Sequence, residues 1–445
     1  MKAIIMAGGK GTRLRPICGA QPKPMTKLMG VPLLEHIIEL LRQNGFTELC
    51  MTLAYKPECI IDYFGDGKDR GVSIEYRVES EPLGTAGGVR ACADFVGNED
   101  FLVISGDAAC DFELSHLARE HEIHGGLVTM ALYSHSEPLR YGTVITDNGG
   151  TVISFIEKPC WERVVTDLVN TGIYMLSPRV LELIGGEGAV DFAKDLFPQL
   201  TSRGDIIGIP MSGYWCDIGD GKSYHRCCMD ALEGRLSLPL ARNKQSLPRV
   251  LGQSDSPLRI SDSLICEGVL LGRDCVIERS IVHPGSRISD NCHIKDSVID
   301  GGSLARGCIV NSSVICADAA LPPDTRTVPG DIISESAVLS AQSEAARQDA
   351  PRHHKGGLCR ELNCRDRAGL MRRLSAALWE AGADFSDGIT LADGRCKVRI
   401  SPVADDSAIT VEAIGGREKE RLAICDKYSE LAKKHGAAEA FVDIQ

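Results

Sequence analysis

The first sixteen residues carry the pattern best suited to chemistry. Residues 2–7 are a short apolar run that leads directly into the glycine-rich segment 8–16. A run of this length bounded by glycines predicts a buried strand that ends in a loop. Glycines let the backbone approach a ligand closely, and exposed N–H groups, with Arg13 and Arg15 nearby, suit an anion such as a triphosphate. The chain therefore opens with a candidate nucleotide-binding edge.

This loop matches neither of two widespread phosphate-binding patterns. It lacks the third glycine of the dinucleotide fingerprint G-x-G-x-x-G. The order Lys10-Gly11-Thr12 also differs from the Gly-Lys-Ser/Thr ending of a Walker-type loop. Taken alone, the segment is equally compatible with a plain turn between a strand and a helix, so its interpretation depends on the motifs that follow.

A sheet must position this loop, and apolar strands alternate with amphipathic helices over residues 1–230. The predicted strands are residues 2–6, 48–54, 101–105, 127–133 and 171–175. The apolar face of a helix that should end near Gly45 is formed by Leu33, Leu34, Ile37, Ile38, Leu40 and Leu41. The alternation predicts a Rossmann-like α/β domain with a mostly parallel sheet. Ligands of such sheets bind at the carboxyl ends of strands, where the loop after Met6 and the pair Gly106-Asp107 both fall.

Apolar residues recur every six positions beyond residue 256. The series, which slips once in phase, is Leu264, Leu270, Val276, Val282, Ile288, Ile294, Val298, Leu304 and Val310. A hexapeptide period predicts a short left-handed parallel β-helix with its apolar side chains inside the coil, and an irregular β-region is the alternative. The open ends of a short coil need covering, so we expect packing on a neighbouring domain or in a homo-oligomer.

These patterns divide the chain into four segments. We expect the catalytic α/β domain at residues 1–232, the β-helix at 250–330, a linker at 331–357 and a small α+β domain at 358–445. Within the last segment, residues 371–379 and 418–435 are predicted helices, and residues 397–400 and 408–413 are predicted strands.

Composition excludes several classes of protein. The net charge of −12 argues against a general nucleic-acid binder. The 18 cysteines show no CxxC pair and no regular His/Cys spacing, which favours free thiols over a zinc site or a disulfide framework. The N-terminus lacks a signal-peptide pattern, and no apolar run is long enough to span a bilayer. We expect a cytoplasmic protein without a membrane partner.

The chain resembles the sugar-nucleotide pyrophosphorylases, or sugar-phosphate nucleotidyltransferases, over its first 220 residues. The motifs stand in the family's order: the opening loop with Pro22-Lys23-Pro24-Met25, then PLGTAG at 82–87, SGD at 105–107, FIEKP at 155–159, NTGIY at 170–174 and WCDIG at 215–219. These enzymes join a nucleoside triphosphate to a hexose 1-phosphate and release pyrophosphate. In that reaction a sugar phosphate attacks the α-phosphorus in line, so cations and backbone donors that hold two anions together supply most of the catalysis.

The resemblance implies a catalytic set built from cations and acids. Arg13 would stabilise the transferring phosphoryl group, and Lys23 would contact the α-phosphate. Asp107 and Asp217 would bind Mg²⁺, which takes one or two carboxylates together with waters and substrate phosphates. The alternatives are structural, because an exposed Arg or Lys is usually a solvated charge and Gly-Asp is a common turn. Asp111, as a possible helix cap, stays outside the metal set.

The resemblance also implies two substrate-binding sets. The nucleotide would contact Gly8, Gly9, Gly11, Thr12, Gly84, Thr85 and Gly87. The sugar phosphate would contact Gly142, Glu157, Lys158, Asn170 and Thr171, with Lys158 on the phosphate. Glu and Asn supply acceptors and donors for neutral hydroxyls. Gly142 could instead be a simple turn glycine.

The base and the hexose are inferred from the similarity of particular motifs to subgroups of the family. LGTAG, NTGIY and the segment 191–198 (DFAKDLFP) look most like mannose-1-phosphate guanylyltransferases, which implies GTP and mannose 1-phosphate as substrates and GDP-mannose as product. A hexapeptide domain fits that group and also fits glucose-1-phosphate adenylyl- and thymidylyltransferases. A uridylyltransferase is a further alternative.

The tail, residues 358–435, resembles the C-terminal domain of phosphohexomutases. The similarity includes Met371-Arg372-Arg373-Leu374 and Asp393-Gly394. A working mutase binds phosphate with an R-P-S-G-T-E-P-like loop, whereas residues 400–406 here are I-S-P-V-A-D-D. The arginine is absent and two acids would repel a phosphate, so we expect no mutase activity.

Two rival functions remain. A regulatory subunit could use the same fold to sense a sugar nucleotide, but such subunits usually lose the arginine or an acid. This chain keeps the full set of Arg13, Lys23, Asp107, Lys158 and Asp217. A hexapeptide acyltransferase would need a catalytic histidine. His283 and His293 are isolated in the sequence, and we expect both at the surface.

Overall fold

The structure is a computed structural model of the 445-residue chain. It describes residues 1–9, 11–160, 163–185, 188–238, 240, 249–250, 259–334, 337–339, 358–364, 366–379, 381–385, 388–394, 396–402, 408–415, 417–438 and 443–444. Two compact units are present. The first comprises residues 1–83, 88–116 and 212–344, and the second comprises residues 84–87, 117–211 and 345–445. Most of the predicted linker, and residues 403–406 of the segment that stands where a mutase has its phosphate loop, lie outside the described residues.

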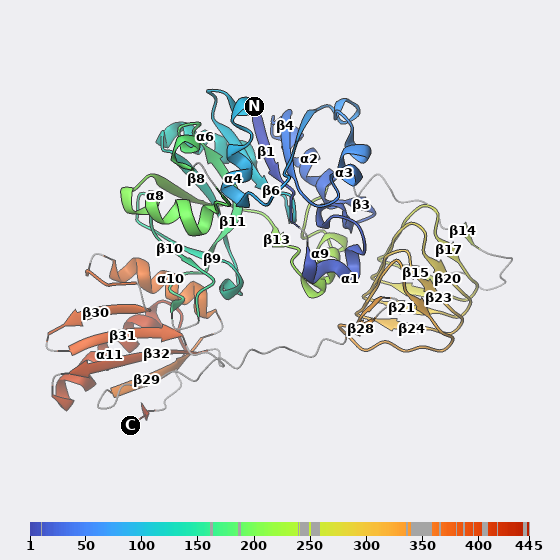
Figure 1. Cartoon of the computed structure of the whole chain (residues 1–445). Coiled ribbons are helices and arrows are strands. Elements are labelled where there is room, and N and C mark those ends of the chain that lie inside the picture. Colours follow the sequence, from blue (N-terminus) through green and yellow to red (C-terminus); the bar gives the residue numbers. More distant parts are fainter. Residues whose placement is uncertain are drawn as a thin grey trace. The chain divides into compact units, whose positions relative to one another are not determined.

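Four parallel strands form the centre of the first unit (Figure 1). Their order is β6 (Phe101–Ser105), β1 (Lys2–Met6), β4 (Glu48–Leu53) and β5 (Ser73–Val78). Apart from Met6, the apolar residues of β1, β4 and β6 are buried, which is typical of parallel strands that are covered on both faces. The three strands predicted in this region are therefore confirmed, and their pairing is parallel.

Helices and short strands complete the first unit. They are η1 (Thr12–Leu14), α1 (Arg15–Cys18), η2 (Lys23–Met25), β2 (Lys27–Leu28), β3 (Val31–Pro32), α2 (Leu33–Gln43), α3 (Pro57–Phe64), η3 (Lys68–Arg70), α5 (Ala93–Val96), β7 (Ala108–Cys110), β13 (Trp215–Asp217) and α9 (Gly221–Leu232). The predicted helix is α2, which buries Leu33, Leu34 and Ile37. Helix α9 begins at a capping box in which Asp220 accepts a hydrogen bond from the backbone N–H of Ser223.

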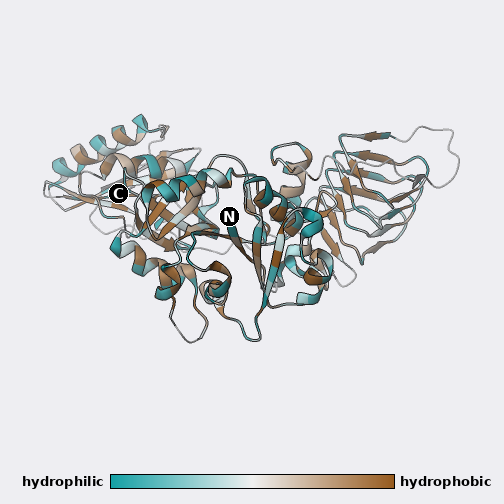
Figure 2. Cartoon of the chain, turned by 90° about the horizontal axis from the view of Figure 1, so that it is seen from above, coloured by the Kyte–Doolittle hydropathy of each residue, from teal (hydrophilic) through white to brown (hydrophobic). Residues whose placement is uncertain are grey.

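The first unit also contains a parallel β-helix with three faces (Figure 1). One face is β14 (Arg249–Val250), β17 (Leu270–Leu271), β20 (Arg287–Ile288), β23 (Ser303–Leu304) and β26 (Ala320–Leu321); the second is β15 (Arg259–Ser261), β18 (Val276–Glu278), β21 (His293–Lys295) and β24 (Ile309–Asn311); the third is β16 (Leu264–Ile265), β19 (Ile281–Val282), β22 (Val298–Ile299), β25 (Val314–Ile315), β27 (Ile332–Ser334) and the antiparallel β28 (Ala337–Leu339). Hydrophobic residues recur on its strands (Figure 2).

The interior of the coil corrects the phase of the hexapeptide prediction. All nine predicted positions lie on strands, but at Leu264, Leu270, Val276 and Val298 the residue in the coil's apolar core is the next one along. Ile265 stacks on Val282 and Ile299, so each of these coils takes 17 residues rather than 18. In each of these coils, one of the three strand-to-strand steps is therefore five residues long instead of six. A uniform six-residue pattern could not reveal this.

The second unit contains a mixed sheet. Its strand order is β10 (Val152–Glu157), β9 (Gly142–Thr146), β11 (Leu168–Leu176), β8 (Val128–Ser134) and β12 (Ile206–Pro210). Only β8 and β12 pair in parallel, so the expectation of a mostly parallel sheet holds for the first unit and not for the second. Its short helices are α7 (Val180–Leu183) and α8 (Phe197–Arg203), while α4 (Gly84–Arg90) and α6 (Leu114–His124) have residues in both units.

The C-terminal part of the second unit is a separate antiparallel sheet with two helices. The strand order is β30 (Ile389–Asp393), β31 (Cys396–Pro402), β32 (Ala408–Gly415), β29 (Leu358–Asn363) and β33 (Asp443–Ile444). The helices α10 (Arg367–Leu378) and α11 (Glu418–Lys434) pack against this sheet and against each other. Both predicted helices and both predicted strands of this α+β domain are confirmed.

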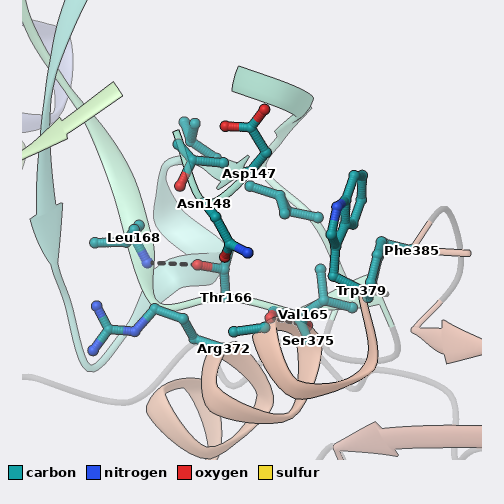
Figure 3. Close-up of a pocket in the computed structure, with 13 residues that line it drawn as sticks. Asp147, Asn148, Val165, Thr166, Leu168, Arg372, Ser375, Trp379 and Phe385 are labelled. Atoms are coloured by element: carbon teal, nitrogen blue, oxygen red, sulfur yellow. Dashed lines mark hydrogen bonds between the residues drawn. The ribbon is translucent and has the colours of Figure 1, made fainter. Parts of the chain in front are cut away.

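Helix α10 also packs against the mixed sheet of the same unit. The Ser375 hydroxyl donates a hydrogen bond to the carbonyl of Val165 over 2.8 Å, and Arg372 Nε lies 2.9 Å from Asp167 Oδ1. A cavity of about 190 Å³ lies between α10 and the mixed sheet. Asn148 and Trp379 face one another across this cavity (Figure 3). None of the residues predicted to bind substrate lines this cavity. Within the described residues, no helix is both long and apolar enough to cross a membrane.

Candidate active site

The glycine-rich loop leaves the carboxyl end of β1. Gly11 has a φ of 58°, and a Cβ at this position would lie only 2.8 Å from the Cβ of Lys23. Gly11 is therefore required both by its backbone conformation and by the close approach of Lys23. A Cβ at Gly9 would meet nothing within 4 Å, and one at Gly8 would make only an ordinary contact with Ala54. The backbone at Gly9 is thus open to a ligand, while Lys10 lies outside the described residues.

Three residues of the predicted catalytic set, Lys23, Asp107 and Asp217, meet near the carboxyl end of β6. Lys23 Nζ lies 2.7 Å from Asp107 Oδ2 and 3.3 Å from Asp217 Oδ1. Lys23 begins η2, Asp107 follows β6, and Asp217 ends β13. Asp107 is 84 residues and Asp217 is 194 residues from Lys23 along the chain, so only the fold brings the three side chains together.

Strand pairing explains how the two acids come to face one lysine. β7 and β13 pair in an antiparallel manner, with Asp217 opposite Ala108, and the N–H of Ile218 donates to the carbonyl of Asp107 over 3.3 Å. A Cβ at Gly106 would lie 3.1 Å from the Met6 carbonyl, so a residue without a side chain is needed where the chain turns beside β1. The SGD motif therefore combines a tight turn with a carboxylate at the sheet edge.

The electrostatics of the cluster favour a charged lysine. Burial alone would lower the pKa of Lys23, but the carboxylates of Asp107 and Asp217 outweigh burial and raise it. Burial would raise the pKa of Asp107, whereas the Lys23 ammonium and the Ser105 hydroxyl lower it. For Asp217, burial and the nearby Asp107 carboxylate raise the pKa despite Lys23. The single Lys23 ammonium therefore does not neutralise both carboxylates, and the pKa of Asp217 stays raised.

Arg13 lies beside this cluster. It belongs to η1, and its side chain is exposed. A Cβ at Gly219 would lie 3.2 Å from Asp217 Oδ2 and 3.7 Å from Arg13 Nη2. Gly219 thus lets the chain pass close to both the Asp217 carboxylate and the Arg13 guanidinium.

The donor set of the cluster fits Mg²⁺. Asp107 and Asp217 already share one cation, the Lys23 ammonium, and two carboxylates are the usual protein contribution to a Mg²⁺ site that also uses waters and phosphates. Among the described side chains, no group of three His, Cys, Asp or Glu forms a metal site made by protein ligands alone. Asp107 and Asp217 are thus the residues that would hold Mg²⁺, and the bound ion would neutralise phosphate charge.

Asp111 has a structural role in this structure. Its Oδ1 accepts a hydrogen bond from the N–H of Tyr214 over 2.6 Å, and its Oδ2 accepts one from the N–H of Ser237 over 2.9 Å. Both oxygens are therefore used on the backbone, which agrees with leaving Asp111 out of the metal set.

In the second unit, the loop predicted to bind the nucleotide is fixed by residues 190–192. The N–H groups of Ala86 and Gly87 donate to the carbonyl of Val190, and the Thr85 hydroxyl donates to Asp191 Oδ2 over 2.9 Å. Gly84 has a φ of 74°, and a Cβ there would lie 2.5 Å from the Val190 carbonyl oxygen. Sequence reasoning missed this anchoring role of Asp191, because the two segments are 106 residues apart.

The residues predicted to bind the sugar phosphate lie on neighbouring strands of the second unit. Gly142 begins β9 directly opposite Glu157, which ends β10. Lys158 follows with a φ of 46°, uncommon for a residue other than glycine, and its Nζ lies 3.3 Å from Glu157 Oε1. Lys158 is 66% exposed, so its ammonium is available to an anion.

Asn170 and Thr171 lie at an irregularity of β11. The register between β11 and β8 shifts between Asn170 and Tyr174, a feature common next to active sites. Asn170 Oδ1 accepts hydrogen bonds from Gly172 N–H and the Tyr174 hydroxyl, each over 3.0 Å. The Thr171 hydroxyl is buried and donates to the Ala131 carbonyl over 2.7 Å. Both contacts with sugar stay predictions, and for Thr171 the hydroxyl is already used by the backbone.

Replacing Gly142 with alanine is expected to weaken sugar-phosphate binding selectively. The new Cβ would lie 2.6 Å from Phe155 Cζ and 2.9 Å from Glu157 Oε2, so the side chains of both Phe155 and Glu157 must move. Since small displacements of positioning groups are costly, we expect KM for the hexose 1-phosphate to rise about tenfold with KM for the triphosphate unchanged. Gly149→Ala in the same hairpin is the control, because its nearest contact would be 3.4 Å. Equal KM values in Gly142→Ala and wild type would refute a sugar-site role.

Comparisons with known proteins identify the families of the first two domains. A model of the nucleotidyl transferase family matches residues 2–234, and a model described as GlmU-like, C-terminal hexapeptide matches residues 249–335. A solved structure from Bacillus anthracis, described as a "putative glucose-1-phosphate thymidylyltransferase" in complex with a sucrose, superposes with a TM-score of 0.50 and 28% identity, covering 55% of this chain and 99% of that one.

Curated relatives extend the similarity beyond the first domain. A rice protein named "probable mannose-1-phosphate guanylyltransferase 3" is 31% identical over 365 residues, which cover 77% of this chain and 98% of the relative. Mannose-1-phosphate guanylyltransferase of Mycobacterium tuberculosis is 32% identical over 298 residues, 66% of this chain and 82% of the relative. A UTP–glucose-1-phosphate uridylyltransferase of Synechocystis is 31% identical over 334 residues, 65% and 86% respectively. The chain therefore belongs to the nucleotidyl transferase family and is a nucleotidyltransferase.

Proposed function

We propose that this enzyme transfers the guanylyl group of GTP to mannose 1-phosphate, with Mg²⁺ as cofactor, and releases pyrophosphate and GDP-mannose. The observation that carries the proposal is the Lys23 ammonium between the carboxylates of Asp107 and Asp217, beside the open glycine loop. Such a site can hold a metal and an α-phosphate side by side, which a reaction between two anions requires.

The proposed step is an in-line displacement at the α-phosphorus. A phosphate oxygen of mannose 1-phosphate forms a new bond to that phosphorus, and the bond to the β-phosphate oxygen breaks, so pyrophosphate leaves. The attacking phosphate is already ionised, and no general base is needed. Lys23 and Arg13 would balance the charge that develops on the phosphoryl oxygens. Glu157 would accept hydrogen bonds from sugar hydroxyls, and Lys158 would pair with the sugar phosphate.

The choice of GTP and mannose rests on the relatives. Proteins named for mannose-1-phosphate guanylyltransfer recur among them, including one aligned over 98% of its own length. A uridylyl-, thymidylyl- or adenylyltransferase for glucose 1-phosphate is the alternative, which the Synechocystis and Bacillus anthracis proteins favour. A regulatory, sugar-nucleotide-sensing role is the third candidate, and the retained Lys23, Asp107 and Asp217 argue against it.

A substrate matrix tests this choice. The purified chain is incubated with each of five nucleoside triphosphates and with mannose or glucose 1-phosphate, and pyrophosphate is measured. We expect kcat/KM for GTP with mannose 1-phosphate to exceed every other pair by at least about tenfold. A higher value for a glucose pair would replace the proposed substrates and keep the reaction class, whereas no release with any pair would favour the sensing role.

Compartment and assembly belong to the same proposal. We propose a cytoplasmic enzyme, which the free thiols support, since no disulfide joins the cysteines at the positions that the structure describes. We also propose a homo-oligomer, because a short β-helix has ends that need covering.

A further inference from the structure

A buried charged cluster joins the β-helix to the segment that carries Lys23, within the first unit. Asp300 Oδ1 lies 3.1 Å from Lys27 Nζ and 3.0 Å from His283 Nδ1. We name these three residues the Asp300 triad. His283 is fully buried, so the expectation of a surface histidine is wrong for it, whereas His293 is exposed. The sequence could not show this, because the buried partner of His283 lies 17 residues away, on the next coil.

The β-helix itself does not need charged residues at the positions of His283 and Asp300. The N–H groups of Cys266, His283, Asp300 and Cys316 each donate to the strand of the next coil, so these four residues occupy equivalent positions. The two outer positions are buried cysteines, which are uncharged. The acid and the histidine therefore stand where smaller thiols also fit, and the feature that distinguishes their position is Lys27.

Asp300 is held in its ionised form. Burial alone would raise the pKa of Asp300, but hydrogen bonding and charge from His283, together with Lys27, outweigh burial and lower it. Its side chain is 8% exposed and that of Lys27 is 31% exposed, so the ion pair is largely removed from water. A buried ion pair is a poor source of stability, because the cost of desolvation offsets the attraction, but it can fix one unique arrangement.

Apolar contacts already hold the β-helix to the first unit's sheet domain. A Cβ at Gly221 would overlap Ile332, and one at Gly30 would lie 2.7 Å from Cys266 Sγ, so both surfaces pack without a gap. The Asp300 triad instead includes Lys27, which begins β2 shortly after Lys23 in the chain. Thr26 N–H donates to the Lys23 carbonyl over 3.1 Å, and the Lys27 carbonyl accepts from the Tyr224 hydroxyl over 2.9 Å.

We propose that Asp300 is a positioning residue: by holding Lys27, it sets the segment that aims Lys23 Nζ between Asp107 and Asp217. The inference rests on the proposed function for its consequence, since a displaced Lys23 would lower kcat. It gives the β-helix an indirect part in catalysis, through Lys27 and the segment that carries Lys23.

Two variants separate positioning from stability. Asp300→Asn keeps the shape and removes the charge, and we expect kcat to fall about tenfold with KM for the hexose 1-phosphate unchanged. The triple variant Lys27→Met/His283→Leu/Asp300→Leu replaces the charges by apolar groups, and we expect Tm at or above the wild-type value with kcat still reduced. Asp290→Asn is the matched control, because it removes the charge of a partly exposed coil aspartate that pairs with Arg273. Recovery of kcat together with Tm in the triple variant would reduce the triad to a structural role.

A second readout does not depend on activity. Trace acetylation followed by mass spectrometry measures how reactive the Lys23 amine is in each variant. Lys23 is 8% exposed and paired with two acids, so it should react slowly in the wild type and in Asp290→Asn. We expect acetylation several-fold faster in Asp300→Asn. Equal labelling in all three proteins would overturn the positioning proposal. An inactive wild type with faster labelling of Asp300→Asn would instead overturn the proposed function and keep the positioning.

Discussion

Asp107→Asn is expected to lower kcat by at least about 10³-fold while the protein stays folded. The substitution keeps the size of the side chain and removes the charge that would bind the metal. It also removes the shorter of the two ion pairs of Lys23, which spans 2.7 Å, and leaves the 3.3 Å pair with Asp217. Both the metal and the orientation of the lysine are therefore affected, which is why we expect the largest effect here. Pyrophosphate release at saturating substrate measures kcat, and thermal unfolding checks the fold.

Asp111→Asn is the matched control for this prediction. Asp111 is close to Asp107 in sequence, but its two oxygens accept hydrogen bonds from the Tyr214 and Ser237 backbones. An asparagine can replace only one of these acceptors, so we expect a lower Tm with kcat within about threefold of wild type. Asp107→Asn should thus lose turnover while it stays folded, whereas Asp111→Asn should keep turnover and unfold at a lower temperature. Turnover by Asp107→Asn near the wild-type rate would show that the metal assignment is wrong.

Lys23→Met is expected to lower kcat by about 10²- to 10³-fold and to change the response to Mg²⁺. Without the ammonium, the Asp107 and Asp217 carboxylates face each other with no cation between them. We therefore expect a lower Tm in the absence of metal. Because an ion that binds only the folded state stabilises it, added Mg²⁺ should raise Tm more in this variant than in the wild type. Differential scanning fluorimetry over a series of Mg²⁺ concentrations measures both effects.

The Mg²⁺ response separates two roles of Lys23. If the lysine only contacts the α-phosphate, kcat falls and the Mg²⁺ shift matches wild type. If the lysine also takes the place of the metal between the two acids, Mg²⁺ raises the Tm of Lys23→Met more than that of the wild type. Arg42→Met is the control, because it removes an exposed cation that pairs with Glu39 on α2 and not with Asp107 or Asp217. This control should change neither kcat nor the shift.

Local patterns predicted the elements that carry the site. The opening strand, β4 and β6 follow from short apolar runs bounded by turns, and α2 follows from its apolar face. Parallel strands place their carboxyl ends at one edge, so the strand pattern alone predicts that the glycine loop and Asp107 lie near each other. The exact meeting of Lys23 with Asp107 and Asp217 could not be predicted, because it depends on the pairing of β7 with β13.

The predictions that failed or stayed open depend on long-range contacts. The coil's phase needed the stacking of Ile265, Val282 and Ile299, and burial of His283 needed Asp300 on the next coil. Thr85 was predicted as a nucleotide contact from its motif, yet its hydroxyl lies between Asp191 and the N–H of Phe192. A single sequence does not contain such partners in any local pattern, so motif reasoning identifies the residue and leaves its neighbours open.

The most direct test of the proposed reaction is the stoichiometry of product formation by the purified chain. GTP, mannose 1-phosphate and Mg²⁺ are supplied, and both products are measured in the same sample. We predict one pyrophosphate for each GDP-mannose, and no product above background when Asp107 is asparagine. Pyrophosphate released without a sugar nucleotide, or no product from any pair in the substrate matrix, would contradict the proposal that Lys23, Asp107 and Asp217 form a nucleotidyl-transfer site.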